Sequence, residues 1–123
     1  MKKSPAEEIC RFLNFVDACK SEYQYASDAV NEEDRRLQDL LHEMEFAADK
    51  AERNRVATKL QRSRRRRREN KDMVKLNEEI VRFFEDQKSR ETLNRMRQLL
   101  GRQRKEEEYL NGERTYKPRV EKG

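Results

Sequence analysis

The sequence contains very little glycine and proline. Only three of its 123 residues are glycine and two are proline, and no glycine precedes Gly101. Tight turns and β-hairpins depend on these residues, so their scarcity argues against a β-rich fold. The glycine-rich loops that bind nucleotide phosphates are also excluded, because neither GxxxxGK[ST] nor GxGxxG occurs.

Long apolar runs and cysteines are scarce as well. The longest uncharged apolar stretch, Phe12 to Val16, has five residues and is interrupted by Asn14. It is far too short to span a membrane or to form a signal-peptide core. Cys10 and Cys19 form no CxxC motif, which argues against a zinc site and against a disulfide framework. We therefore expect no membrane insertion, no bound metal and a reducing, cytoplasmic setting.

Residues suited to catalysis are few. His42 is the only histidine, and it follows Leu41 on a strongly charged segment, where we interpret it as a solvated surface residue. Cys19 occupies a position of the apolar repeat described below, where a buried thiol is unreactive. We predict that the protein is not an enzyme, with no catalytic residues and no cofactor.

Apolar residues are a minority, but they are regularly spaced. Hydrophobic residues make up 33% of the chain and charged residues 45%, which is a thin supply for a globular core. A strict alternation of three and four nevertheless runs from residue 9 to residue 51, and twelve of its thirteen positions are apolar. Such a repeat predicts a helix with one apolar side, here called the seam, which packs against another helix. The main seam residues are Ile9, Phe12, Val16, Tyr23, Val30, Leu37, Leu40 and Met44, and the seam ends at Ala51.

The limits of the helices are less sharply defined. Ser4-Pro5 starts a helix, since serine caps and proline fits the first turn. This helix either continues to about Arg62 or breaks near Asn31, beside Glu33, the one charged residue in the seam. Later, the alternation resumes and predicts a second buried face, and Gly101 is expected to end or bend the last helix. The residues of this second face are Met73, Leu76, Ile80 and Phe83.

These patterns predict an all-α fold. We expect an elongated helical bundle or coiled-coil hairpin of three to four helices, in which the long seam favours a homo-oligomer. Residues 1–110 form a single helical domain that includes a basic segment, 52–71. Residues 111–123 form an extended or flexible tail, because Asn111-Gly112 marks a turn and Pro118 forbids further helix.

Charge is distributed in two opposing blocks. Residues 52–71 contain ten lysines or arginines against two acids, a net charge of +8. Residues 28–49 contain eight acids against two arginines, a net charge of −6. One interpretation is that the blocks pair with each other, within one chain or between copies. That pairing can neutralise only about half of residues 64–68, because five consecutive helical arginines point in all directions around the helix.

The arginine-rich stretch is the main candidate binding site. Residues 64–68 are all arginine without a lysine, and guanidinium groups bind phosphate through two hydrogen bonds and stack on bases. We therefore predict contact with RNA, DNA or a nucleic-acid-bound protein complex. The predicted contact residues are Arg55, Lys59, Arg62, Arg64, Arg65, Arg66, Arg67, Arg68 and Lys71. The tail could add Arg114, Tyr116, Lys117 and Arg119, although a plain solvated tail is the more frequent explanation of such residues.

Three stretches together resemble a known group of proteins. EICRFLNFVDACKSEYQYA, ERNRVATKL and RKEEEYLNGERTYKPRV are similar to short helical proteins carried by phages and prophages of low-GC Gram-positive bacteria. The resemblance implies a binding protein in the bacterial cytoplasm. Its implied targets are host machinery, including nucleic-acid-guided immune complexes, in the manner of anti-CRISPR proteins. The alternative is a homo-oligomeric coiled coil, with a structural or sequestering role, whose charge blocks pair with each other.

Overall fold

A computed structural model describes residues 3–116 and residue 120. The described chain contains three helices, α1 (Pro5–Glu45), α2 (Lys50–Phe83) and α3 (Gln87–Asn111), and no strand. The predicted all-α fold is confirmed. None of these helices, within the described residues, is both long and apolar enough to cross a membrane.

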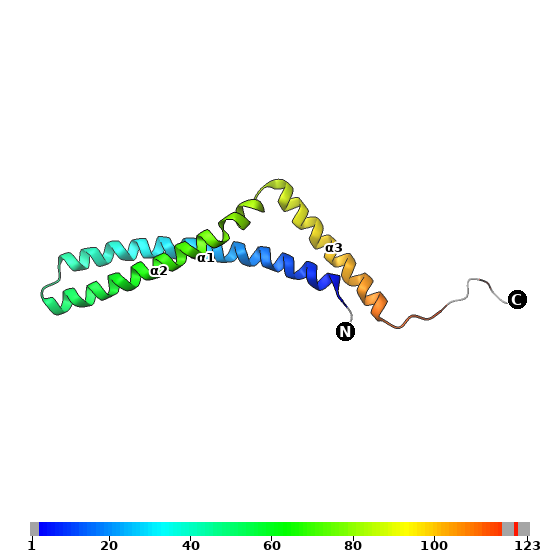
Figure 1. Ribbon diagram of the computed structural model, residues 1–123, viewed down its shortest axis with the longest axis horizontal. Coiled ribbons are helices and arrows are strands. Elements are labelled where there is room, and N and C mark those ends of the chain that lie inside the picture. Colours follow the sequence, from blue (N-terminus) through cyan, green and yellow to red (C-terminus); the bar gives the residue numbers. More distant parts are fainter. Residues whose placement is uncertain (1–2, 117–119, 121–123) are drawn as a thin grey trace. The chain divides into compact units, whose positions relative to one another are not determined.

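The helices form two compact units, and α1 contributes to both. One unit combines Met1–Phe15 with Gln87–Gly123, and the other is Val16–Asp86. In the second unit α2 turns back along α1 to form an antiparallel helical hairpin (Figure 1). In the first unit the start of α1 lies antiparallel to α3, since Ser4 contacts Glu107 and Cys10 contacts Arg104.

The hairpin turn is made without glycine or proline. Asp49 has an extended backbone and caps α2, because its carboxylate accepts the Glu52 N–H at 2.8 Å. The Glu52 carboxylate in turn accepts the Ala48 N–H at 2.9 Å. This reciprocal arrangement satisfies amides that the first turn of a helix leaves unpaired. Neither predicted boundary is therefore correct: α1 passes through Asn31 unbroken and ends at Glu45, well before Arg62.

The seam of α1 is buried along most of its length. Val16, Cys19, Ala26 and Leu40 are all buried. The half-buried seam residues are Ile9, Tyr23, Val30, Leu37 and Met44.

Two seam positions were predicted wrongly. Phe12 is 38% exposed, and its neighbour Leu13 is buried instead. This part of α1 belongs to the unit that contains α3, so its buried side is set by α3 and not by the repeat that packs against α2. Ala51 is exposed in the first turn of α2, because the helix that carries the seam ends before it.

The face of α2 that contacts α1 also differs from the prediction. Its buried and half-buried positions alternate by four and three, and half of them are polar. They are Val56, Leu60, Ser63, Arg67, Asn70, Val74, Asn77 and Val81. The predicted face points outward instead: Leu76 is 71% exposed and Phe83 is 67% exposed, while Met73 is also exposed and Ile80 half-buried.

The polar face of α2 is retained because its side chains find partners. The Asn77 amide donates to the Glu22 carboxylate at 3.3 Å and to the Met73 carbonyl at 2.9 Å.

Gly101, contrary to expectation, lies inside α3, where a methyl group in place of its hydrogen would meet no neighbouring atom.

A carboxylate of α3 accepts hydrogen bonds at the N-terminus of α1. Ser4 accepts the Glu7 N–H, as a capping residue does, and its hydroxyl donates to Glu107. The second oxygen of Glu107 accepts the Ala6 N–H at 2.8 Å. The hydroxyl of Ser4 and, less strongly, the amide of Ala6 hold the pKa of Glu107 below its usual value of 4.5.

Replacing Glu107 by glutamine is expected to make the protein less stable at neutral pH but not in acid. A carboxyl group whose pKa is lowered by folding stabilises the protein above pH 4.5, and this contribution disappears as the pH falls through the lowered pKa. Urea midpoints followed by circular dichroism at pH 7 and pH 3 measure it. Glu106→Gln, at an exposed neighbouring position, is the control. An equal loss for Glu107→Gln at both pH values would contradict the expectation.

Candidate functional site

All nine basic residues predicted to bind nucleic acid lie on α2, within the hairpin unit. The helix continues through the whole arginine run, so successive side chains are turned by about 100° from one another. Arg67 is half-buried, on the side of α2 that faces α1. The other eight residues are exposed.

Three of the nine residues form ion pairs with acids of α1. The Arg67 Nε donates to Asp34 Oδ1 at 2.6 Å, the Arg66 Nε lies 3.5 Å from Glu33, and the Lys59 Nζ lies 3.7 Å from Glu43. The expected pairing of the two charge blocks therefore occurs within one chain. The basic side chains of these pairs remain 34% to 57% exposed, so each pair stabilises the hairpin only slightly.

The other six of the nine residues have side chains without an acidic partner in the described chain. Within residues 3–116 and 120 their side chains form no hydrogen bond or ion pair, and every one of them is exposed. These six are Arg55, Arg62, Arg64, Arg65, Arg68 and Lys71. Their charges are available to an external anion.

Four of the basic residues come together beside α1. Arg64, Arg67, Arg68 and Lys71 line a cavity of about 470 Å³ between the two helices. Its α1 wall consists of Asp34 and Leu37. We call this cavity the basic groove. Four cations and one carboxylate give it a net charge of +3, and Leu37 gives it an apolar patch.

A second cavity, of about 570 Å³, lies at the end of the hairpin near the turn. It places Arg55 and Lys59 among three acids, so its charge is nearly balanced. The acids are Asp39, Glu43 and Glu52. His42 also lines it and lies edge-on against Phe46, with ring centres 4.8 Å apart.

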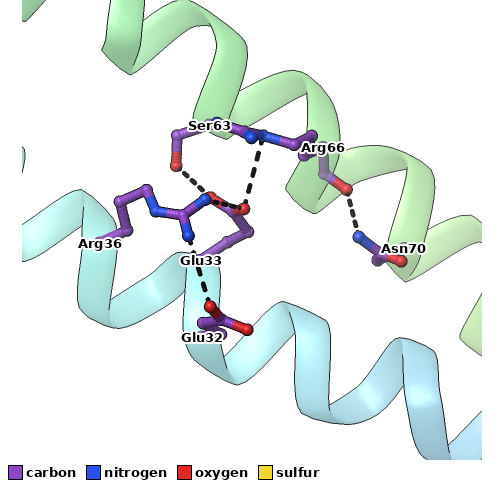
Figure 2. A network of polar contacts seen from close by, with 6 residues as sticks. All are labelled: Glu32, Glu33, Arg36, Ser63, Arg66 and Asn70. Atoms are coloured by element: carbon purple, nitrogen blue, oxygen red, sulfur yellow. Dashed lines mark hydrogen bonds and ion pairs between the residues drawn. The ribbon is translucent and has the colours of Figure 1, made fainter.

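The centre of the hairpin is a buried polar cluster (Figure 2). Glu33 is only 6% exposed, and its carboxylate accepts the Ser63 hydroxyl at 2.7 Å. Arg36 donates to the same carboxylate at 2.6 Å and also reaches Glu32 at 3.4 Å. Arg66 lies near Glu33 and keeps its backbone carbonyl bonded to the Asn70 amide. The cluster holds the arginine run in register against α1.

Sequence reasoning missed the α1 side of the site. Asp34 was noticed only as part of an acidic block, and Glu33 only as a gap in the seam. The signal in the sequence was that Glu33 in the seam of α1 could pair with Ser63 on the inner face of α2. This pairing can be recognised only when the alignment of α2 against α1 is known.

Two of the four predicted tail residues are described. The Arg114 guanidinium lies over the Tyr109 ring, 5.6 Å from its centre, and Tyr116 is 85% exposed. Lys117 and Arg119 lie outside the described residues. No group of three or more potential ligands that could hold a metal ion occurs in the described part of the chain.

Comparison of the chain with protein-family models, with curated proteins and with solved structures finds no match.

Proposed function

We propose that this protein is a non-enzymatic nucleic-acid-binding protein that contacts the phosphate backbone of RNA or DNA through α2. The observation that supports the proposal is the set of six exposed basic residues without a partner in the described chain. Five residues of the run, Arg64 to Arg68, are arginine, whose guanidinium group matches the geometry of a phosphate.

This interface would bind through charge with little choice of sequence. Each phosphate neutralised by an arginine releases condensed counterions, and the gain in their entropy provides affinity that falls with salt. Contacts of this kind position a protein on nucleic acid but do not distinguish bases. The physiological target that we propose is therefore defined by its exposed nucleic acid, such as a host ribonucleoprotein that a phage protein inhibits.

The test is a fluorescence anisotropy titration of labelled RNA and DNA over a series of salt concentrations. The variant with glutamine at Arg64 to Arg68 loses the three arginines of the run that have no acidic partner in the described chain, so its slope of log K against log salt should be less steep by about 2 to 3. A variant with five lysines at the same positions is the matched control and should keep the slope. A flat salt response of the wild-type protein would refute the proposal.

The second candidate function is a structural homo-oligomer. The exposed residues Met73, Leu76 and Phe83 favour it, because they continue a three-four spacing on the outer side of α2. Light scattering on a variant with lysine at Leu76 and Phe83 tests this role. If these apolar side chains join the copies, the variant has a lower mass than the wild-type protein, whereas an unchanged mass counts against the role.

A further inference from the structure

We propose that the basic groove holds one single strand of nucleic acid, and that the opposite side of α2 contributes little to binding. This inference rests on the proposed function and assigns its contact site. The phosphates would lie along Arg64, Arg68 and Lys71, beside Leu37 of α1.

The two flanks of α2 differ in charge balance. Arg64, Arg68 and Lys71 follow one another by four and three residues, which places them on one flank of the helix. Only Asp34 opposes them, and it is already paired with Arg67.

The other flank is neutralised in part. Arg55, Lys59 and Arg66 follow one another by four and seven residues and lie roughly opposite the first three. This flank meets Glu33 and Glu43 through ion pairs, and Arg55 lines the acid-rich cavity near the turn. Arg62 on this flank and Arg65 on the outer side of α2 also have no partner in the described chain. The basic groove nevertheless has the densest positive charge, a net +3 from four cations and one carboxylate.

The shape of the groove favours a single strand. Packed helices have axes about 8 to 10 Å apart, so the furrow between them is narrow. A whole duplex is too wide to enter this furrow and would contact only its rim. A single strand can follow such a furrow, with its bases against apolar or guanidinium surfaces. Leu37 and the arginine planes offer those surfaces.

The spacing of the cations suits a chain of phosphates. Arg64 and Lys71 lie about 10 Å apart along the helix axis at 1.5 Å per residue. The three side chains therefore meet neighbouring phosphates of one strand and do not converge on a single group. A linear polyanion fits this arrangement better than a compact anion.

Asp34 acts as a competitor for the strand. Its carboxylate accepts from Arg67 at 2.6 Å and is the one negative group in the groove. Asparagine at this position would remove the repulsion and release Arg67 to the phosphates. Asp34→Asn is expected to bind a single strand about threefold to fivefold more tightly, as one added phosphate contact implies.

The experiment compares two triple variants that lose the same residue types. The groove variant is Arg64→Gln, Arg68→Gln and Lys71→Gln, and the control is Arg55→Gln, Lys59→Gln and Arg66→Gln. The probes are labelled oligouridine and oligothymidine of about 12 nucleotides and a duplex of the same length. Circular dichroism verifies that each variant retains its helices.

We expect the groove variant to bind the single strands about 10-fold to 100-fold more weakly at roughly 0.1 M salt, with a slope less steep by about 2. The control should lose less than about threefold, and the duplex should bind more weakly than either strand. Equal losses in both variants, tighter binding of the duplex, or weaker binding by Asp34→Asn would overturn the inference and leave the proposed function standing. If the wild-type protein binds no nucleic acid at low salt, the proposed function itself fails.

Discussion

Replacing Glu33 by lysine is expected to lower the free energy of unfolding by at least about 3 kcal/mol. Glu33 is buried and balances Arg36 and Arg66, while Ser63 donates to its second oxygen. A lysine would bury an ammonium group beside those two guanidinium groups and leave the Ser63 hydroxyl without its acceptor. Like charges in a site of low dielectric constant repel strongly, and the only carboxylate left in the cluster would be that of the exposed Glu32, 3.4 Å from Arg36.

The measurement is thermal unfolding followed by circular dichroism. A loss of this size corresponds to a midpoint lower by at least about 12 °C for a unit of this length. Glu32→Lys is a matched control, since it makes the same change of charge one residue earlier. The Glu32 side chain is 70% exposed and its contact with Arg36 is long, so we expect a loss of less than about 1 kcal/mol. Equal midpoints for the two variants would show that the cluster does not stabilise the hairpin.

Truncating Leu93 to alanine is the second change with a large expected effect. Leu93 lies on α3 and is only 2% exposed, among the most completely buried side chains of the described chain. Removing its three outer carbon atoms loses hydrophobic burial and leaves a cavity, at a cost of about 2 to 5 kcal/mol. In a chain with so few apolar residues, a loss of this size is a large fraction of the total stability.

Leu99→Ala provides the control for this truncation. Leu99 lies on the same helix and is 41% exposed. Because both changes alter helix propensity in the same way, the difference between them measures burial. Urea unfolding should show a clear loss for Leu93→Ala and less than about 1 kcal/mol for Leu99→Ala. Similar losses at both positions would mean that α3 contributes only as a helix and not through its packing.

The fold class follows from the sequence because α1 has a regular apolar repeat. Val16, Ala26 and Leu40 are buried where the repeat predicts. The face of α2 could not be predicted in the same way, since half of its contact positions are polar. From hydrophobic periodicity we predicted that Leu76 and Phe83 would be buried. In the structure Asn77 is buried instead, and its amide has partners on α1 and on its own helix.

The end of α1 was missed because apolar periodicity says little about helix ends. The repeat continues through Ala47 and Ala51, so the pattern alone favours a longer helix. The local signal was an aspartate three residues before a glutamate, Asp49 and Glu52, which forms the cap of α2. Apolar spacing cannot detect this signal, since it consists entirely of polar side chains.

The candidate site was predictable in composition but not in detail. The nine basic residues could be selected from the run of arginines alone. Which of them remain without partners depends on the register between α1 and α2, and that register is fixed by Glu33 and Ser63 at the centre of the hairpin. Only this register shows that Arg64 and Arg68 share a groove while Arg66 meets an acid.

The capped turn between α1 and α2 also has a consequence for the order in which the hairpin folds. Contacts beside the turn join residues close in sequence, such as Glu43 with Lys59. Glu33 and Ser63 are 30 positions apart, and Glu22 and Asn77 are 55 apart. Closing a longer loop costs more chain entropy, so the pairs form most readily in order of increasing distance from the turn. We therefore expect the hairpin to fold from the turn at Asp49 outward, so that the arginine run meets α1 about halfway through the process.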